Sequence, residues 1–112
     1  MTKEKQVTPG SGNVFEDLGF PNPQEHLTKA RLVSHIAIII KERGLTQAAA
    51  GSIIGLDQPK VSALLNGQFR GFSVYRLMAF IAALGRDVEI VMTKSRRRLT
   101  KTAEIGRIVV RS

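Results

Sequence analysis

Few side chains in this sequence could carry out covalent or metal chemistry. The chain has no cysteine, and its two histidines, His26 and His35, have no carboxylate or thiolate partner at a spacing suited to a metal ion or a catalytic site. The sequence also has no glycine-rich motif of the phosphate-cradling kind. We therefore expect no enzyme, no metal and no cofactor, and the polar side chains are better suited to binding.

Basic residues dominate the charge, but they are unevenly placed. The chain carries a formal charge of +8, and the stretch from Lys94 to Ser112, with seven basic residues and one acidic residue, contributes +6 of it. A basic balance favours an anionic partner such as nucleic acid only where the charge lies on the docking surface. Bulk charge alone therefore does not establish nucleic-acid binding by the folded part of the chain.

The stretch from Gln47 to Leu65 has the residue spacing of two short helices that cross closely, a helix-turn-helix. The small residues Ala50 and Gly51 let the first of these helices approach the second, and Gly55 permits the left-handed backbone of a tight turn. The apolar residues expected to seal the seam are Ile54, Leu56, Val61 and Leu64. This set of residues at fixed offsets is more specific than a single glycine or a run of alanines.

Start and stop signals divide the chain into four predicted helices. A long first helix begins after Asn22, has Pro23 in its first turn and Glu25 as a capping-box acid, and ends before Gly44. The other three pair a polar N-cap with a terminating glycine: Thr46 with Gly55, Asp57 with Gly67, and Ser73 with Gly85. The core-facing residues expected in the first and fourth helices are Leu27, Leu32, Ile36, Ile39 and Ile40, and Val74, Leu77, Met78, Ile81 and Leu84.

The pattern changes to a two-residue period over residues 86–94. The apolar residues that alternate there are Val88, Ile90 and Met92. This alternation predicts a half-buried strand, which is not stable alone. The strand must pair either with an N- or C-terminal segment of its own chain or with its copy across a two-fold axis, and we favour the copy, which makes a homodimer.

The length suits one compact domain with flexible ends. We divide the chain into an N-terminal arm (1–13), a helical domain (14–85), a dimerisation strand (86–94) and a basic C-terminal tail (95–112). Because 43% of the residues are hydrophobic but only 5% aromatic, the core should consist mostly of Ile, Leu, Val and Ala. The longest apolar run, 36–40, is too short to cross a bilayer, and we expect a cytoplasmic protein with no membrane partner.

The segment from Gln47 to Gly67 resembles the helix-turn-helix of the lambda-repressor-like, or Xre-type, regulators. The motifs Phe15-Glu-Asp-Leu-Gly-Phe20, Gly71-Phe-Ser-Val-Tyr75 and Gly85-Arg-Asp-Val-Glu-Ile90 resemble the HigA-like antitoxin subgroup, and the likeness covers about two-thirds of the chain. It implies a mainly α fold, a lambda-repressor-like bundle of four to five helices with a C-terminal β-strand for dimerisation. Gly51 departs from the family's usual alanine, which should weaken its helix by about 0.5 to 1 kcal/mol.

The resemblance implies that the helix from Gln58 to Leu65 is a recognition helix in the major groove of double-stranded DNA. Gln58 would read a base, because its amide can both donate to and accept from adenine, and Lys60 would reach a guanine or a phosphate. Gln47, at the start of the preceding helix, and Arg70, in the following loop, would hold backbone phosphates. The other residues expected at the DNA surface are Pro59, Ser62, Ala63 and Asn66.

Two functions fit these implied roles. The first is a transcriptional repressor whose homodimer binds an operator with two half-sites about 34 Å apart and occludes a promoter. The second is an antitoxin that neutralises a small ribonuclease toxin through surfaces outside the recognition helix and regulates its own operon. The two functions are compatible, and a co-purifying small toxin or a short neighbouring reading frame would distinguish them.

Overall fold

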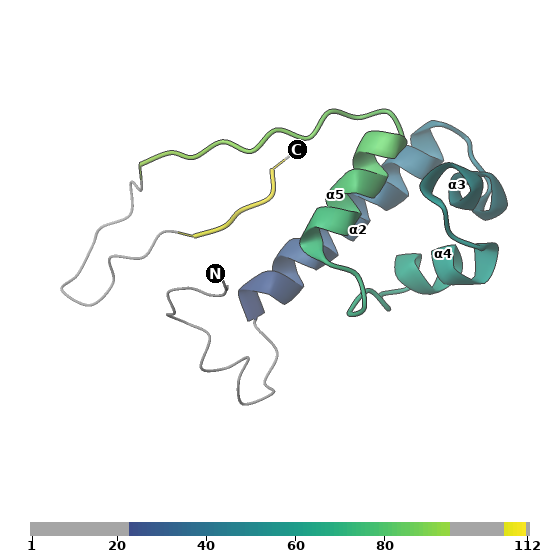
Figure 1. Cartoon of the computed structure of the whole chain (residues 1–112), viewed down its shortest axis with the longest axis horizontal. Helices are drawn as coiled ribbons and strands as arrows, with labels where there is room; N and C mark the ends of the chain where they lie inside the picture. The colour runs from purple at the N-terminus through teal and green to yellow at the C-terminus, as the bar shows by residue number, and fades with distance from the viewer. Residues whose placement is uncertain (1–22, 95–106, 112) are drawn as a thin grey trace, which may run out of the picture.

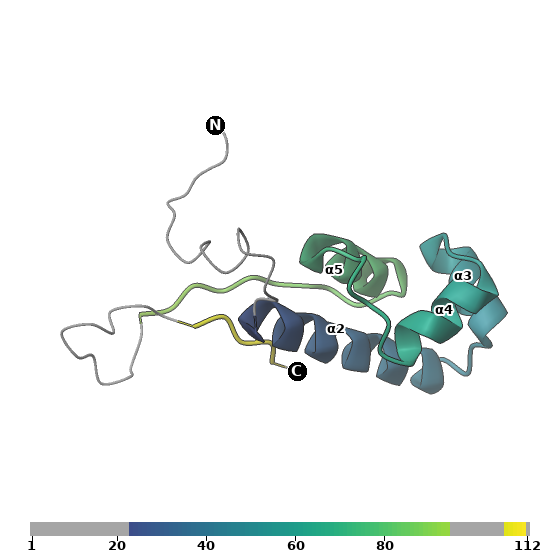
Figure 2. The same ribbon diagram turned by 90° about the horizontal axis from the view of Figure 1, so that it is seen from below.

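The computed structural model describes residues 23–94 and 107–111 of the chain. Within them lie four helices, α2 (Pro23–Glu42), α3 (Gln47–Ile54), α4 (Gln58–Leu65) and α5 (Val74–Ala83). The long α2 packs mainly against α5, while α3 and α4 pack together at one end of this pair (Figures 1 and 2). The mainly helical prediction is confirmed. The predicted arm, the motif Phe15–Phe20 and most of the basic tail lie outside the described residues.

The helices begin where their capping residues predict. The side-chain oxygens of Thr46, Asp57 and Ser73 each accept a hydrogen bond from the backbone amide three residues later, at 3.0 Å. Each bond satisfies one of the amides that a helix start leaves without a partner. After α3, Gly55 has a φ of +85°, and this left-handed residue turns the chain directly into α4.

One hydrophobic cluster joins the four helices. Its most completely buried large side chains are Ile36, Val61, Leu64, Leu77 and Leu84. Two phenylalanines, Phe69 and Phe80, are also buried, and the other buried hydrophobic residues are all Ile, Leu, Val or Ala, as the composition predicted. Val110, close to the C-terminus, is half-buried and packs against the same cluster.

The predicted apolar face of α2 is wrong at its N-terminal end. Leu27 is 52% exposed, whereas its neighbour Thr28 is 7% exposed. The buried face of α2 runs from Thr28 through Leu32 to Ile36, at intervals of four residues. Each residue of a helix is rotated by about 100° from the previous one, so Leu27 points away from that face.

The predicted strand over residues 86–94 is absent from the structure, because the described residues contain no strand. The segment extends from the end of α5 beyond the helices (Figure 1), and after Arg86 its backbone makes no hydrogen bond to another described residue. Ile90 and Met92 are 74% and 92% exposed, so the predicted half-buried alternation does not occur. A strand needs a hydrogen-bonded neighbour, and the described residues 107–111 do not supply one.

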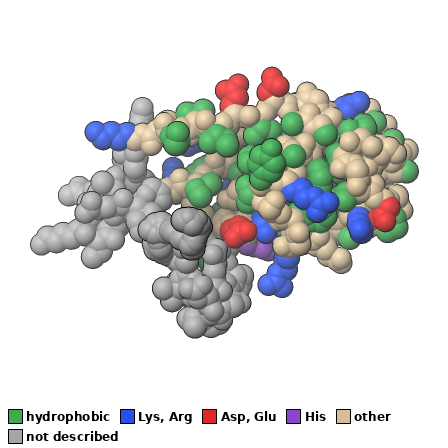
Figure 3. All heavy atoms as spheres, viewed as in Figure 1, with side chains coloured by type: hydrophobic (Ala, Val, Ile, Leu, Met, Phe, Trp, Pro, Cys, Tyr) green, Lys and Arg blue, Asp and Glu red, His purple; other side chains and the backbone are tan. Residues whose placement is uncertain are grey.

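The surface of the described residues carries both cationic and hydrophobic side chains. Figure 3 shows cationic side chains scattered over the helical part and hydrophobic side chains along the extended segment. In the described ranges, no three His, Cys, Asp or Glu side chains are grouped so that they could hold a metal ion. None of the helices described has the length and apolar content needed to cross a bilayer.

Candidate nucleic-acid interface

α3 and α4 approach closely because the residue at their contact has no side chain. A Cβ built on Gly51 would lie 2.3 Å from the carbonyl oxygen of Leu56 and 3.2 Å from Cγ2 of Val61. The Leu56 amide also donates to the Gly51 carbonyl at 2.9 Å, which holds the turn directly against α3. The family usually has alanine at position 51. In this chain the turn after α3 leaves no room for a methyl group there, so Gly51 fits where alanine would not.

α4 has one buried side and one exposed side. Val61 and Leu64 are inserted in the core, at 0% and 1% exposure. The predicted site residues that are exposed are Gln58, Pro59 and Lys60 in the first turn and Asn66 at the C-cap. Ser62 and Ala63 are half-buried rather than fully exposed, because they lie where the exposed side of the helix meets its packed side. Four of the predicted site residues are thus exposed on or beside α4, and the two between them are small and partly covered.

A hydrogen bond joins the two helices at this surface. Gln58 Nε2 donates to Gln47 Oε1 at 2.7 Å, and so connects the first turns of α3 and α4. The bond uses one atom of each amide, and each amide keeps further donor and acceptor capacity for another partner. The sequence predicted separate roles for the two glutamines but not this contact. The bond restricts the orientation of the Gln58 side chain.

The loop that carries Arg70 is anchored to α2. Lys29 Nζ donates to the Arg70 carbonyl at 3.4 Å and pairs with Glu25 at 3.2 Å. The His26 ring packs against Phe69, with 5.1 Å between ring centroids. The loop therefore contacts α2 on both sides of this position, while Arg70 itself is exposed.

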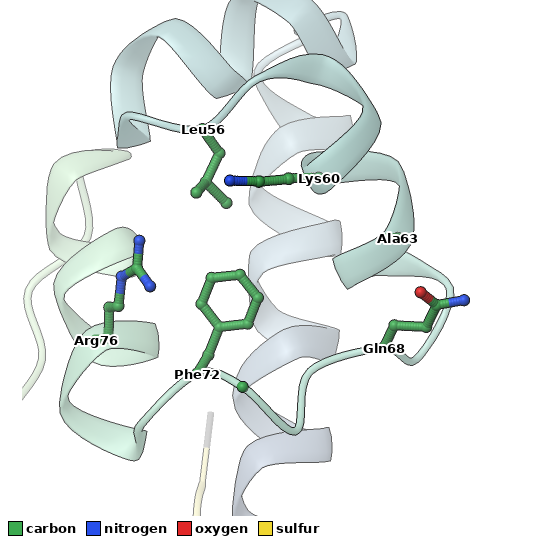
Figure 4. A pocket seen from close by; sticks show the side chains of 7 residues that line it. Leu56, Lys60, Ala63, Gln68, Phe72 and Arg76 are labelled. Carbon is green, nitrogen blue, oxygen red and sulfur yellow. The ribbon is translucent and has the colours of Figure 1, made fainter.

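A cleft of about 340 Å³ lies between α4, the loop after it and α5 (Figure 4). Its lining residues are Leu56, Lys60, Ala63, Gln68, Gly71, Phe72 and Arg76. Arg76 was not among the predicted site residues. The available signal was its place three residues after the N-cap Ser73, which puts it in the first turn of α5 near the loop of Arg70.

Comparisons with known proteins agree with the helix-turn-helix fold. A family model described as a helix-turn-helix domain matches residues 14–93, and the chain belongs to this helix-turn-helix family. A solved structure described as an XRE family transcriptional regulator is 42% identical, with a TM-score of 0.71, and the match covers 82% of this chain and 99% of that one. The chain is thus a DNA-binding regulator of the XRE family, as the resemblance implied. None of the curated proteins matches it.

Proposed function

We propose that the protein is a sequence-specific repressor that binds operator DNA as a homodimer and reads the major groove with α4. The Gln47–Gln58 hydrogen bond carries this proposal, because it joins α3 to the exposed start of α4. A side chain fixed before binding loses less conformational entropy on contact with a base. Gln58 is therefore proposed as the principal reader, paired with adenine through its remaining amide atoms.

The surrounding residues divide into base contacts and backbone contacts. Pro59, Ser62 and Ala63 would lie against base edges, where their small surfaces suit a thymine methyl or a single hydrogen bond. Gln47, Asn66 and Arg70 would hold phosphates on the two sides of the groove. Support for Arg70 comes from the contacts of its loop with α2, which restrict its backbone before DNA binds.

The homodimer is proposed to form through residues 86–94. This segment is extended, its backbone has no partner among the described residues, and Ile90, Val91 and Met92 are more than 70% exposed. Pairing with the same segment of a second copy would satisfy the backbone groups and cover these side chains. The two copies of α4 would then face half-sites about 34 Å apart on the DNA.

The proposal is tested by selecting bound duplexes from a random pool and then measuring two variants on the selected site and on random DNA. Gln58→Ala should lose about 1 to 3 kcal/mol on the selected site and relax the base preference at one position. Arg70→Ala should weaken binding to both DNAs alike and lower the salt slope by about 1. Arg31→Ala, an exposed cation of α2 outside this surface, is the matched control and should change neither.

Two results would contradict the proposal. If the pool yields no enriched sequence, the protein is not a sequence-specific reader. If Gln58→Ala loses the same affinity on selected and random DNA, Gln58 does not read a base. A normal circular dichroism spectrum for each variant is required, so that a loss of binding is not confused with unfolding.

An antitoxin role is the second proposal, and it rests on the HigA-like motifs, of which Gly71–Tyr75 and Gly85–Ile90 lie in the described residues. Tyr75 is 77% exposed and lies outside α4, so a partner could bind there while α4 contacts DNA. Co-expression with the product of a short adjacent reading frame tests this role. Growth that is arrested by that product alone and restored by this protein would support it, and arrest that persists would reject it.

A further inference from the structure

We infer that the cleft between α4 and α5 holds one DNA backbone phosphate with its deoxyribose, and that Lys60 and Arg76 are the two cations that bind the phosphate. The inference rests on the proposed insertion of α4 into the major groove. It adds Arg76 as a backbone contact, and it assigns Lys60 to a phosphate instead of a guanine.

The charges that line the cleft all have one sign. Its seven lining residues include Lys60 on the α4 side and Arg76 on the α5 side, and none of them is acidic. Figure 4 shows the Lys60 side chain pointing from α4 toward Leu56, with the Arg76 guanidinium rising from the α5 side. Among the described residues, no acidic side chain forms an ion pair with either cation. An anion placed between the two walls would therefore be attracted by both.

The Arg76 guanidinium contacts two aromatic rings. It lies 4.9 Å from the centroid of the Phe72 ring and 5.6 Å from that of Phe80. The two rings contact each other edge to face at 5.7 Å, so they form one rigid support. A guanidinium has five N–H donors in a planar fork, so Arg76 can contact the rings and still form two parallel bonds to phosphate oxygens.

The apolar part of the cleft suits a sugar. Leu56 is 9% exposed and Phe72 is half-buried, and both contribute carbon surface to the lining between the cations. The cleft is also open to solvent along one side. Small-molecule sites usually enclose most of their ligand, so an open cleft better fits one unit of a polymer that continues past both ends.

The position of the cleft agrees with the geometry of DNA. The major groove is about 12 Å wide, close to the diameter of a helix with its side chains, so a helix in the groove has a phosphate wall on each flank. One flank of α4 faces α3, where Gln58 meets Gln47. The other flank, with Lys60 and Ala63, lines the cleft. The cleft therefore lies where the second phosphate wall would pass.

The inference is tested on the full chain by combining substitutions in the protein with replacements in the DNA backbone. Each phosphate around the selected half-site is replaced in turn by an uncharged methylphosphonate, and affinity is measured for wild type and for Arg76→Gln. At one position, the replacement should weaken wild-type binding about tenfold but the variant less than about twofold. Lys60→Gln should show the same loss of sensitivity at the same phosphate. Either variant should lower the salt slope by about 1.

Arg76 also packs on two rings, so its variants need a control for folding. Arg76→Lys keeps the charge but not the planar fork, and it should bind between wild type and Arg76→Gln. Lys60 is exposed and its removal should leave the melting temperature unchanged, which keeps the test valid if Arg76→Gln unfolds. If every phosphate replacement costs Lys60→Gln as much as it costs wild type, the inference is overturned while the proposed function stands. If wild type enriches no sequence, the proposed function itself fails.

Discussion

The helical part of this protein and the segment 86–94 both carry regularly spaced apolar residues, yet only the helical part buries them. Val61 in α4 is 0% exposed, whereas Val91 in the segment is 73% exposed. A helix satisfies its backbone hydrogen bonds within itself, so local signals are enough to form it and packing can follow. An extended segment satisfies its backbone only beside a neighbour. The helix-turn-helix therefore satisfies its backbone within one chain, while the backbone of residues 87–94 has no hydrogen-bond partner among the described residues.

The largest expected difference between the two regions is in stability. Val61→Ala should lower the free energy of unfolding by about 2 to 3 kcal/mol, because it removes buried carbon and leaves a cavity. Val91→Ala is the matched control, and it should change that free energy by less than about 0.5 kcal/mol. Urea unfolding at a protein concentration where the chain is monomeric measures both. Equal losses would show that residue 91 is buried within the single chain, and the contrast between the regions would be lost.

A smaller effect is expected at the contact between α3 and α4. Alanine in place of a helical glycine usually stabilises, by about 0.5 to 1 kcal/mol. At Gly51 the added methyl would meet the Leu56 carbonyl oxygen at 2.3 Å, so Gly51→Ala should instead destabilise by about 1 to 3 kcal/mol. Thermal and urea unfolding measure the change.

The chain offers a matched control for this substitution. At Gly71 an added methyl group would have no atom within 4 Å, and φ is not positive, so Gly71→Ala should leave stability within about 0.5 kcal/mol of wild type. A Gly51→Ala variant that is as stable as wild type or more so would show that the turn can move away from α3. The seam between the two helices would then be less rigid than its contacts indicate.

The parts of the fold that the sequence predicted are those set by local chemistry. Thr46, Asp57 and Ser73 cap their helices as expected, because the cap is a bond between residues three apart. The prediction that Leu27 faces the core is wrong. The spacing of apolar residues defines a face of the helix, but it does not show which part of that face another segment covers. The strand prediction for residues 86–94 rests on alternating apolar residues, and alternation does not show which segment a strand would pair with.

The same distinction holds in the candidate site. The exposed position of Gln58 follows from the helical phase of Val61 and Leu64, and the sequence was sufficient to predict it. Its hydrogen bond to Gln47 and the place of Arg76 opposite Lys60 depend on how separate helices pack. The Ser73 N-cap places residue 76 in the first turn of α5, but its place opposite Lys60 depends on the orientation of α5 relative to α4.

The last prediction concerns a change that should barely affect the single chain but should separate its copies. Ile90→Pro removes a backbone N–H that has no partner among the described residues, so the monomer's unfolding free energy should change by less than about 0.5 kcal/mol. In a dimer paired through residues 86–94, the same N–H or its neighbours would lie in the ladder, and proline would interrupt it. Sedimentation equilibrium should therefore find a dimer for wild type and for Ile90→Val, and a monomer for Ile90→Pro. A dimer that survives the proline would place the contact elsewhere, and the segment's exposed side chains would then need a different partner.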